Sequence, residues 1–358
     1  MTAPPPSPER TTLDRRVRML RTAMGPMIAA ALEDPDVVEV LLNPDGSLWL
    51  DRLSTGRAPT GVTLSAADGE RIIRLVAAHV GAEVHRGQPL LTAELPETGE
   101  RFEGVLPPAA PGPAFALRKR AVGVIPLDRY VADGMMTEEQ AEFLRQAVHE
   151  RQNILIAGGT STGKTTLANA LLAEIATTGD RVLVLEDTIE LQCSARDHVP
   201  LRTRAGAVSM AELVRATMRL RPDRVVVGEV RGGEALDLVK VWGTGHPGGV
   251  ATIHAGSALG ALLRLEQLIL EVAVNPPRAL IAEAVNVVIY ITGRGRKRRI
   301  ETISRVTGHD STGYHLVAMN GALDAPFPEL PAPTPLAPSS SPPPEADSPS
   351  STLPGELP

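Results

Sequence analysis

The 358-residue sequence has little cysteine and no long apolar run, and each shortage excludes a class of protein. Its single cysteine, Cys193, cannot form an intramolecular disulfide, and the chain does not begin like a signal peptide, so we expect a reducing, cytoplasmic setting. The longest stretch without a charged residue, 241–263, contains two histidines and several glycines, unlike a membrane-spanning helix. We therefore expect any membrane association to be peripheral.

Positive charge and aromatic side chains are too scarce for an extended nucleic-acid surface. The formal net charge is −6, and the few aromatic residues do not alternate with basic ones. Five acids and no Lys or Arg fall after residue 320, which leaves the rest of the chain near −1. Nucleic-acid-binding proteins usually present a basic face and stacking platforms, so direct nucleic-acid binding is not expected.

Length and patterning predict a smaller N-terminal α+β domain. The chain exceeds what one core usually organises, and 43% hydrophobic residues suffice for two cores. We expect disorder over 1–10, an α+β domain over 11–120 and a linker over 121–133, which lacks strong periodicity. Within the domain, the pattern predicts a helix from Leu13, a helix over 65–80 and strands over 37–42, 47–53, 90–94, 101–106 and 114–118.

A second, larger domain is predicted over 134–320. Thr137 and Gln140 have the spacing of a capping box that begins its first helix. Helical stretches then alternate with β-rich runs at 153–157, 181–185, 224–227, 249–253 and 285–291. This alternation predicts an α/β fold with a parallel-rich sheet covered on both faces. Residues 321–358 hold 12 of the 32 prolines and are predicted to form a disordered, acidic tail.

A phosphate-binding loop is predicted between the first strand and the next helix of this domain. Residues 158–165 read GGTSTGKT and match the P-loop pattern G-x-x-x-x-G-K-[ST], with both required neighbours present. Lys164 would reach the β- and γ-phosphates, and the Thr165 hydroxyl would bind Mg²⁺. The predicted nucleotide-binding residues of the loop are Gly158, Gly159, Thr160, Ser161, Thr162, Gly163, Lys164, Thr165 and Thr166.

Two further apolar strands deliver acids where open α/β sheets bind ligands. Glu186 ends one strand, and Glu229 follows another. An ATPase needs one carboxylate to hold Mg²⁺ through water and one to polarise the attacking water. Gly228 stands where many P-loop proteins have the Mg²⁺-ordering aspartate, which favours Glu229 for the metal and Glu186 as the base. The sequence leaves that division open, and an ordinary surface carboxylate is the alternative for each.

Two histidines flank the strand predicted over 249–253. His254 follows it and is our candidate to hydrogen-bond the γ-phosphate and respond to its loss. His246 precedes the strand, and a structural hydrogen bond is the alternative for either ring. Because no third ligand is evident, metal binding by this pair is not expected.

The motifs taken in order resemble those of hexameric secretion ATPases. GGTSTGKT, VLEDTIEL, RLRPDRVVVGEVRGGEA and GTGHPGGVATIHAGS are similar to the Walker A, Asp box, Walker B and His box. NPDGSLW, AELPETGERFEGVLPP and FALRKRAV resemble the N-terminal domain of the TrbB-like conjugal-transfer members. The resemblance implies a RecA-like domain and an ATP-hydrolysing homohexamer of two stacked rings. It further implies inner-membrane type IV secretion partners, at the cytoplasmic face of the inner membrane.

The resemblance also assigns site residues. It carries catalytic roles to Lys164, Glu186, Glu229 and His254, with Thr165 and Glu229 at the Mg²⁺. Basic residues of the N-terminal domain contact phosphates in this family, and the matching ones here are Arg101, Arg118 and Arg120. A spacing of two predicts that the last pair faces the same way on one strand, and a solvated basic strand end is the alternative. A second group precedes the Walker B strand and is most simply a solvated helix surface: Arg215, Arg219 and Arg221.

Four alternative functions stay open. A pilus-assembly or type II secretion ATPase belongs to the same superfamily, but a single cysteine cannot build the tetracysteine zinc module that type II members commonly carry. A RecA-like nucleic-acid motor would need the basic and aromatic surface that is lacking here. A small-molecule P-loop kinase is disfavoured by the His box, and ATP turnover would exclude a non-hydrolysing scaffold.

Overall fold

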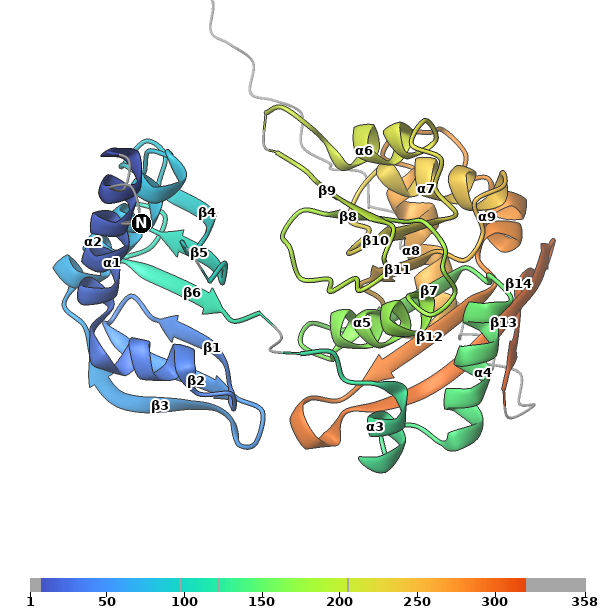
Figure 1. Cartoon of the computed structure of the whole chain (residues 1–358), viewed down its shortest axis with the longest axis horizontal. Helices are drawn as coiled ribbons and strands as arrows, with labels where there is room; N and C mark the ends of the chain where they lie inside the picture. Colours follow the sequence, from blue (N-terminus) through green and yellow to red (C-terminus); the bar gives the residue numbers. More distant parts are fainter. Residues whose placement is uncertain (1–7, 97, 121–122, 205, 320–358) are drawn as a thin grey trace, which may run out of the picture. The chain divides into compact units, whose positions relative to one another are not determined.

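A computed structural model describes residues 8–96, 98–120, 123–204 and 206–319 (Figure 1). Two β-sheets organise these residues, one of six strands and one of eight, so the fold is mixed α/β as predicted. Across these ranges, no helix is both long and apolar enough to cross a membrane. The predictions of disorder for residues 1–7 and 321–358 lie outside the described residues.

The first sheet is antiparallel, in the order β3-β2-β1-β6-β5-β4. Its strands are β1 (Val37–Leu42), β2 (Ser47–Arg52), β3 (Gly56–Thr63), β4 (Leu90–Glu94), β5 (Arg101–Val105) and β6 (Ala114–Arg118). Helices α1 (Pro8–Glu33) and α2 (Ala66–Val80) share its hydrophobic core. Five of the strands were predicted, and β3 was not. Helix α1 begins at Pro8, inside the segment expected to be disordered, so that expectation was wrong for residues 8–10.

The second sheet has the order β14-β13-β12-β7-β11-β10-β8-β9. The six strands from β12 to β9 run parallel, and β13 and β14 are antiparallel additions at one edge. The strands are β7 (Ile154–Gly158), β8 (Val182–Glu186), β9 (His198–Arg202), β10 (Arg224–Val227), β11 (Val250–Ile253), β12 (Val287–Thr292), β13 (Arg299–Asp310) and β14 (Gly313–Ala318). The predicted parallel-rich sheet is confirmed.

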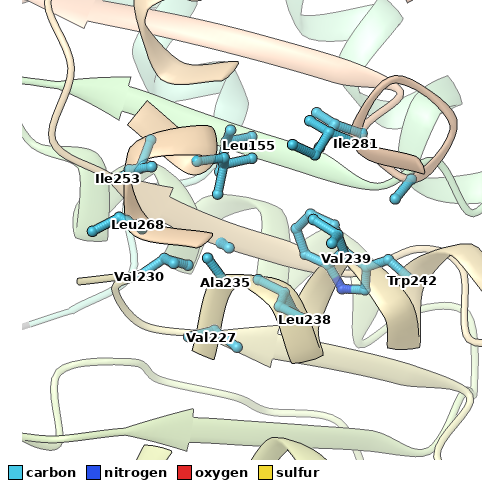
Figure 2. Close-up of a cluster of buried hydrophobic side chains, with 14 of the residues drawn as sticks. Leu155, Val227, Val230, Ala235, Leu238, Val239, Trp242, Ile253, Leu268 and Ile281 are labelled. Atoms are coloured by element: carbon cyan, nitrogen blue, oxygen red, sulfur yellow. The ribbon is translucent and has the colours of Figure 1, made fainter. Parts of the chain in front are cut away.

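Helices cover both faces of this sheet (Figure 1). One face packs against α3 (Leu127–Ala132), α4 (Glu138–His149) and α5 (Lys164–Ile175). The other packs against α6 (Met210–Thr217), α7 (Glu234–Gly243), α8 (Ala258–Ile269) and α9 (Arg278–Ala284). Figure 2 shows the core on the face covered by α6 to α9, where Leu155 of β7 and Trp242 of α7 are both buried. Because β7, β8, β10 and β11 are covered on both sides, their residues are almost all apolar, whereas β9 at the edge of the sheet is mostly exposed.

Part of the segment predicted to be a linker is a helix. Leu127 and Tyr130 of α3 are fully buried in the same core as α4 and α5. Six residues with two buried side chains are too short for a periodic signal, so only tertiary packing reveals this helix. The capping box that begins α4 is formed as predicted, with Thr137 and Gln140 bonding reciprocally.

Candidate nucleotide site

Four neighbouring parallel strands bring the predicted site residues to one edge of the eight-stranded sheet. The order β7-β11-β10-β8 places the P-loop, His254, Glu229 and Glu186 next to one another at the strands' carboxyl ends. Residues scattered over about a hundred positions of sequence thus meet because parallel strands end together. The prediction that Glu186, Glu229 and His254 lie at the carboxyl ends of strands is confirmed.

The P-loop has the backbone that phosphate binding requires. Gly163, the N-cap of α5, has φ 96°, and Ser161 also has a positive φ of 62°. No side chain caps α5 at Gly163, so the first N–H groups of the helix are left for an anion. The Thr162 hydroxyl donates to the Gly159 carbonyl oxygen at 3.0 Å and closes the loop. Gly158 has no room for a side chain, since a Cβ there would lie 2.6 Å from the Ile291 carbonyl oxygen.

Lys164 is buried and folded onto the loop that carries it. Its Nζ donates to the carbonyl oxygens of Gly158, at 3.1 Å, and Gly159, at 3.0 Å, and lies 3.4 Å from Nδ1 of His254. Burial lowers the pKa of Lys164, and the charge of Glu229 acts in the opposite direction. Lys164 has neutral partners and, within the described ranges, no carboxylate in direct contact, so a phosphate would be a better partner for its charge.

His254 connects Lys164 to Glu229. Its Nε2 lies 2.7 Å from Oε1 of Glu229, while Nδ1 faces the Lys164 ammonium. Because an ammonium only donates, the arrangement that satisfies both contacts has the proton on Nε2. Burial and then the Lys164 charge lower the pKa of His254, which favours this neutral ring. Glu229 also forms an ion pair with Arg231.

Glu186 is the more buried of the two predicted carboxylates, at 5% exposure. Its Oε1 accepts the backbone N–H groups of Glu190, at 2.8 Å, and Leu191, at 2.7 Å, which leaves Oε2 for another partner. Burial raises the pKa of Glu186, although those two backbone hydrogen bonds counteract it. Gly228 makes room for it, because a Cβ at 228 would lie 3.2 Å from Cγ of Glu186.

A pocket at this edge joins these groups. It is lined by Arg101, Thr165, Glu186, Asp187, Thr188, Glu190, Gly228, Glu229 and Arg231. The sequence-based prediction missed four of these, Asp187, Thr188, Glu190 and Arg231, although all four stand inside the quoted motifs. The guanidinium of Arg231 lies 3.6 Å from Asp187, so it is held between two carboxylates. No periodicity marks such contacts, because they depend on strands that are distant in sequence.

Three other predicted residues, His246, Arg118 and Arg120, do not line this pocket. His246 precedes β11, at the opposite edge of the sheet, and its Nδ1 lies 3.0 Å from the Pro222 carbonyl oxygen. Strand β6 ends at Arg118, so the prediction that Arg118 and Arg120 share one strand was wrong. Arg120 lies beyond the strand and pairs with Glu94 at 3.5 Å. Of the group predicted to be solvated, the helical residue Arg215 pairs with Asp237 at 3.5 Å.

Comparisons with known proteins agree with this geometry. Residues 95–296 match the family described as "Type II/IV secretion system protein". The probable conjugal transfer protein TrbB of Sinorhizobium fredii (strain NBRC 101917 / NGR234) is 51% identical, and the conjugal transfer protein TrbB of Rhizobium radiobacter 48% identical. Each alignment covers 84% of this chain and 93% of the relative.

A solved structure shows the same fold at lower identity. The Legionella pneumophila ATPase DotB aligns with a TM-score of 0.55 at 18% identity, over 76% of this chain and 78% of that chain. At that identity the likeness concerns the fold alone. The family match spans more than half of the chain, and the relatives match nearly all of their length. The chain belongs to the type II/IV secretion system protein family.

Proposed function

We propose that this chain is an ATP-hydrolysing motor that energises a conjugative type IV secretion system. The observation that carries the proposal is the gathering of Lys164, Glu186, Glu229 and His254 with the P-loop at one edge of a parallel sheet. Family membership and the similarity to two TrbB proteins support the conjugative role over a pilus or type II role. A kinase or a nucleic-acid motor has no comparable support.

In the proposed reaction, ATP binds with its phosphates against the N–H groups of the P-loop and displaces the carbonyl contacts of Lys164. Its ammonium then holds the terminal phosphates and offsets the charge of the transition state. Glu186 is the base, because burial favours its protonated form and Oε2 has room for a proton from water. Glu229 is a weaker base in this arrangement, since Arg231 and His254 both stabilise its anion.

The family implies Mg²⁺, and the oxygen donors of the pocket fit a hard cation. The Thr165 hydroxyl and the Glu229 carboxylate line the same pocket, as do four further acidic or hydroxyl side chains. When bound, Mg²⁺ would neutralise phosphate charge. His254, which is held by Glu229, would accept or lose a contact as the γ-phosphate leaves.

The wider assembly is part of the same proposal. The chain would form a homohexamer at the cytoplasmic face of the inner membrane, bound to membrane components of the secretion apparatus. The six-stranded sheet with α1 and α2 would be the N-terminal domain, and the eight-stranded sheet would be the RecA-like motor domain. Arg101, Arg118 and Arg120 would bring positive charge to the nucleotide from the N-terminal domain.

Purified wild-type chain and Lys164→Ala test the proposal through phosphate release from MgATP and through restoration of mating to a donor lacking the gene. We expect the variant to lose at least about 10³-fold in turnover and to fail in mating. Assembly of the variant, followed by size and circular dichroism, is the control for folding. Turnover of the variant within about threefold of wild type would remove the P-loop from the mechanism.

A further inference from the structure

The connection between β12 and β13 carries a dense positive charge that the motifs leave without a role. Five of the seven residues from Gly293 to Arg299 are basic: Arg294, Arg296, Lys297, Arg298 and Arg299. Ile291, near the end of β12, pairs with Gly158, where the P-loop begins. The basic turn therefore emerges from the sheet at the same edge as the phosphate-binding loop.

Arg298 packs directly on the P-loop. A Cβ placed on Gly163 would lie 2.8 Å from both Cζ and Nε of Arg298. The guanidinium thus lies against the backbone of Gly163, which is the N-cap of α5 and precedes Lys164. The position is anchored nearby, since the Ile300 N–H donates to the Met135 carbonyl oxygen at 2.8 Å.

The guanidinium of Arg298 has no counter-charge. Among the residues that the structure describes, it forms no ion pair or side-chain hydrogen bond, and its Nε is buried without a partner. Burial lowers the pKa of Arg298, the direction expected when a charge loses water without gaining an acid. The hydroxyl of Tyr130, whose electrostatic influence reaches Arg298, is likewise buried without a partner.

Two other arginines near the strands of this sheet, Arg224 and Arg231, have their charge compensated by acids. Arg224 is almost fully buried, and its Nε bonds Asp180 at 2.6 Å. Arg231 lies between Glu229 and Asp187. A half-buried cation without an acid costs free energy, which a bound anion would return.

We propose that Arg298 is a further nucleotide-binding residue, whose guanidinium binds phosphate oxygens of the nucleotide held by the P-loop. The inference rests on the proposed function and adds a binding group that comes from outside the four motifs. Arginine suits the role because its planar fork binds phosphate oxygens through two hydrogen bonds and stays charged. The same contact would hold the basic turn against the P-loop when nucleotide is bound.

The test measures MgADP affinity by calorimetry and thermal unfolding with and without MgADP. Arg298→Met keeps most of the side-chain volume and removes the charge. We expect its ADP affinity to fall by about tenfold or more, while its nucleotide-free unfolding temperature is unchanged or higher. Arg298→Lys should recover part of the affinity, since it restores a charge without the fork. Lys297→Met, an exposed residue of the same turn, is the matched control and should change affinity less than about twofold.

Three outcomes distinguish a failure of this inference from a failure of the proposed function. If wild type binds ADP and Arg298→Met binds it equally well, the inference is wrong and the nucleotide site stands. The inference is also wrong if Arg298→Met keeps its ADP affinity but unfolds at a lower temperature, because the side chain then only packs against the loop. Failure of wild type itself to bind ADP would instead overturn the proposed function.

Discussion

The two edges of the eight-stranded sheet both concentrate charge, but in the described part of the chain the cations that contact the P-loop are not paired with acids as the arginines at the amino edge are. At the amino edge, Asp180 bonds Arg224, Arg151 and the Thr178 hydroxyl, and Arg224 also donates to the Gly248 carbonyl oxygen. The charges and hydrogen-bonding atoms of these groups are paired with one another. At the carboxyl edge, Lys164 has only carbonyl oxygens and a neutral ring, and Arg298 has no acid at all among the described residues.

The difference separates charge used for folding from charge kept for a ligand. A buried ion pair with complete hydrogen bonding belongs to the stability of the empty chain, and breaking it is costly. An uncompensated cation lowers the stability of the empty chain and regains that free energy when an anion binds. Substitutions at the amino edge should therefore change unfolding, and those at the carboxyl edge should change binding or turnover.

The largest effect on stability is expected from Asp180→Ala, which leaves the guanidinium of Arg224 buried without its acid. We expect the free energy of unfolding, measured in urea at pH 7, to fall by about 3–5 kcal/mol. Burial tends to raise the pKa of Asp180, but Arg224, Thr178 and Arg151 lower it below the ordinary value of 3.8. The stabilisation by this carboxylate is therefore complete above pH 4 and lost as pH falls through the lowered pKa. Equal stability of variant and wild type at pH 7 would mean that the cluster does not hold the fold together.

Glu186→Gln should lower turnover by roughly 10²-fold or more while ADP affinity stays within about threefold. The amide can still accept the N–H groups of Glu190 and Leu191, but it cannot take a proton from water. Because burial raises the pKa of Glu186, wild-type turnover should begin to fall at a higher pH than an exposed glutamate would allow. Initial rates of hydrolysis between pH 5 and 8 measure this fall of turnover on the acid side. A variant that hydrolyses ATP normally would assign the base to another residue.

Glu229→Gln gives the matched comparison between the two carboxylates. Its anion is already bound by Arg231 and His254, so its loss should slow turnover and also free the imidazole. We expect a fall in turnover of roughly 10²-fold, with affinity for MgADP less affected. The assay is the same as for Glu186→Gln. Normal hydrolysis by this variant would leave Glu229 as an ordinary carboxylate at a strand end.

The smallest effect is expected from His254→Ala. The ring connects Lys164 with Glu229. Its loss should reduce turnover by about tenfold and leave the unfolding free energy within about 1 kcal/mol, because the ring is half exposed. Phosphate release and urea unfolding measure the two quantities. A larger loss of stability than of turnover would place His254 with the structural cluster instead.

Sequence patterning predicted the motor sheet because buried parallel strands are continuous apolar runs with ligands at their carboxyl ends. That one rule placed Glu186, Glu229 and His254 correctly at the strand ends. It missed β9, whose residues include Pro200 and are mostly exposed, and it missed β13, which is rich in polar residues, and β14. The edge strands β9 and β14 each bury only one face or less, which leaves no continuous apolar run in the sequence.

Contacts between segments that are distant in sequence could not be predicted either. Arg298 reaches Gly163 only through the pairing of β12 with β7, and Arg231 reaches Asp187 only through the pairing of β10 with β8. Neither arginine stands at a spacing that predicts a ligand. Arg120 lies two residues beyond the last residue of β6, and no sequence pattern marks where that strand ends.

The most direct test of the central claim is urea unfolding of wild type and Lys164→Met, each with and without MgADP. Burial lowers the pKa of Lys164, so its charged form is disfavoured in the folded, empty chain and removing that charge should not cost stability. We expect Lys164→Met to be at least as stable as wild type without nucleotide and to gain far less stability from MgADP. A variant that is less stable when empty, yet gains as much from MgADP as wild type does, would contradict the claim that this edge keeps its charge for the nucleotide.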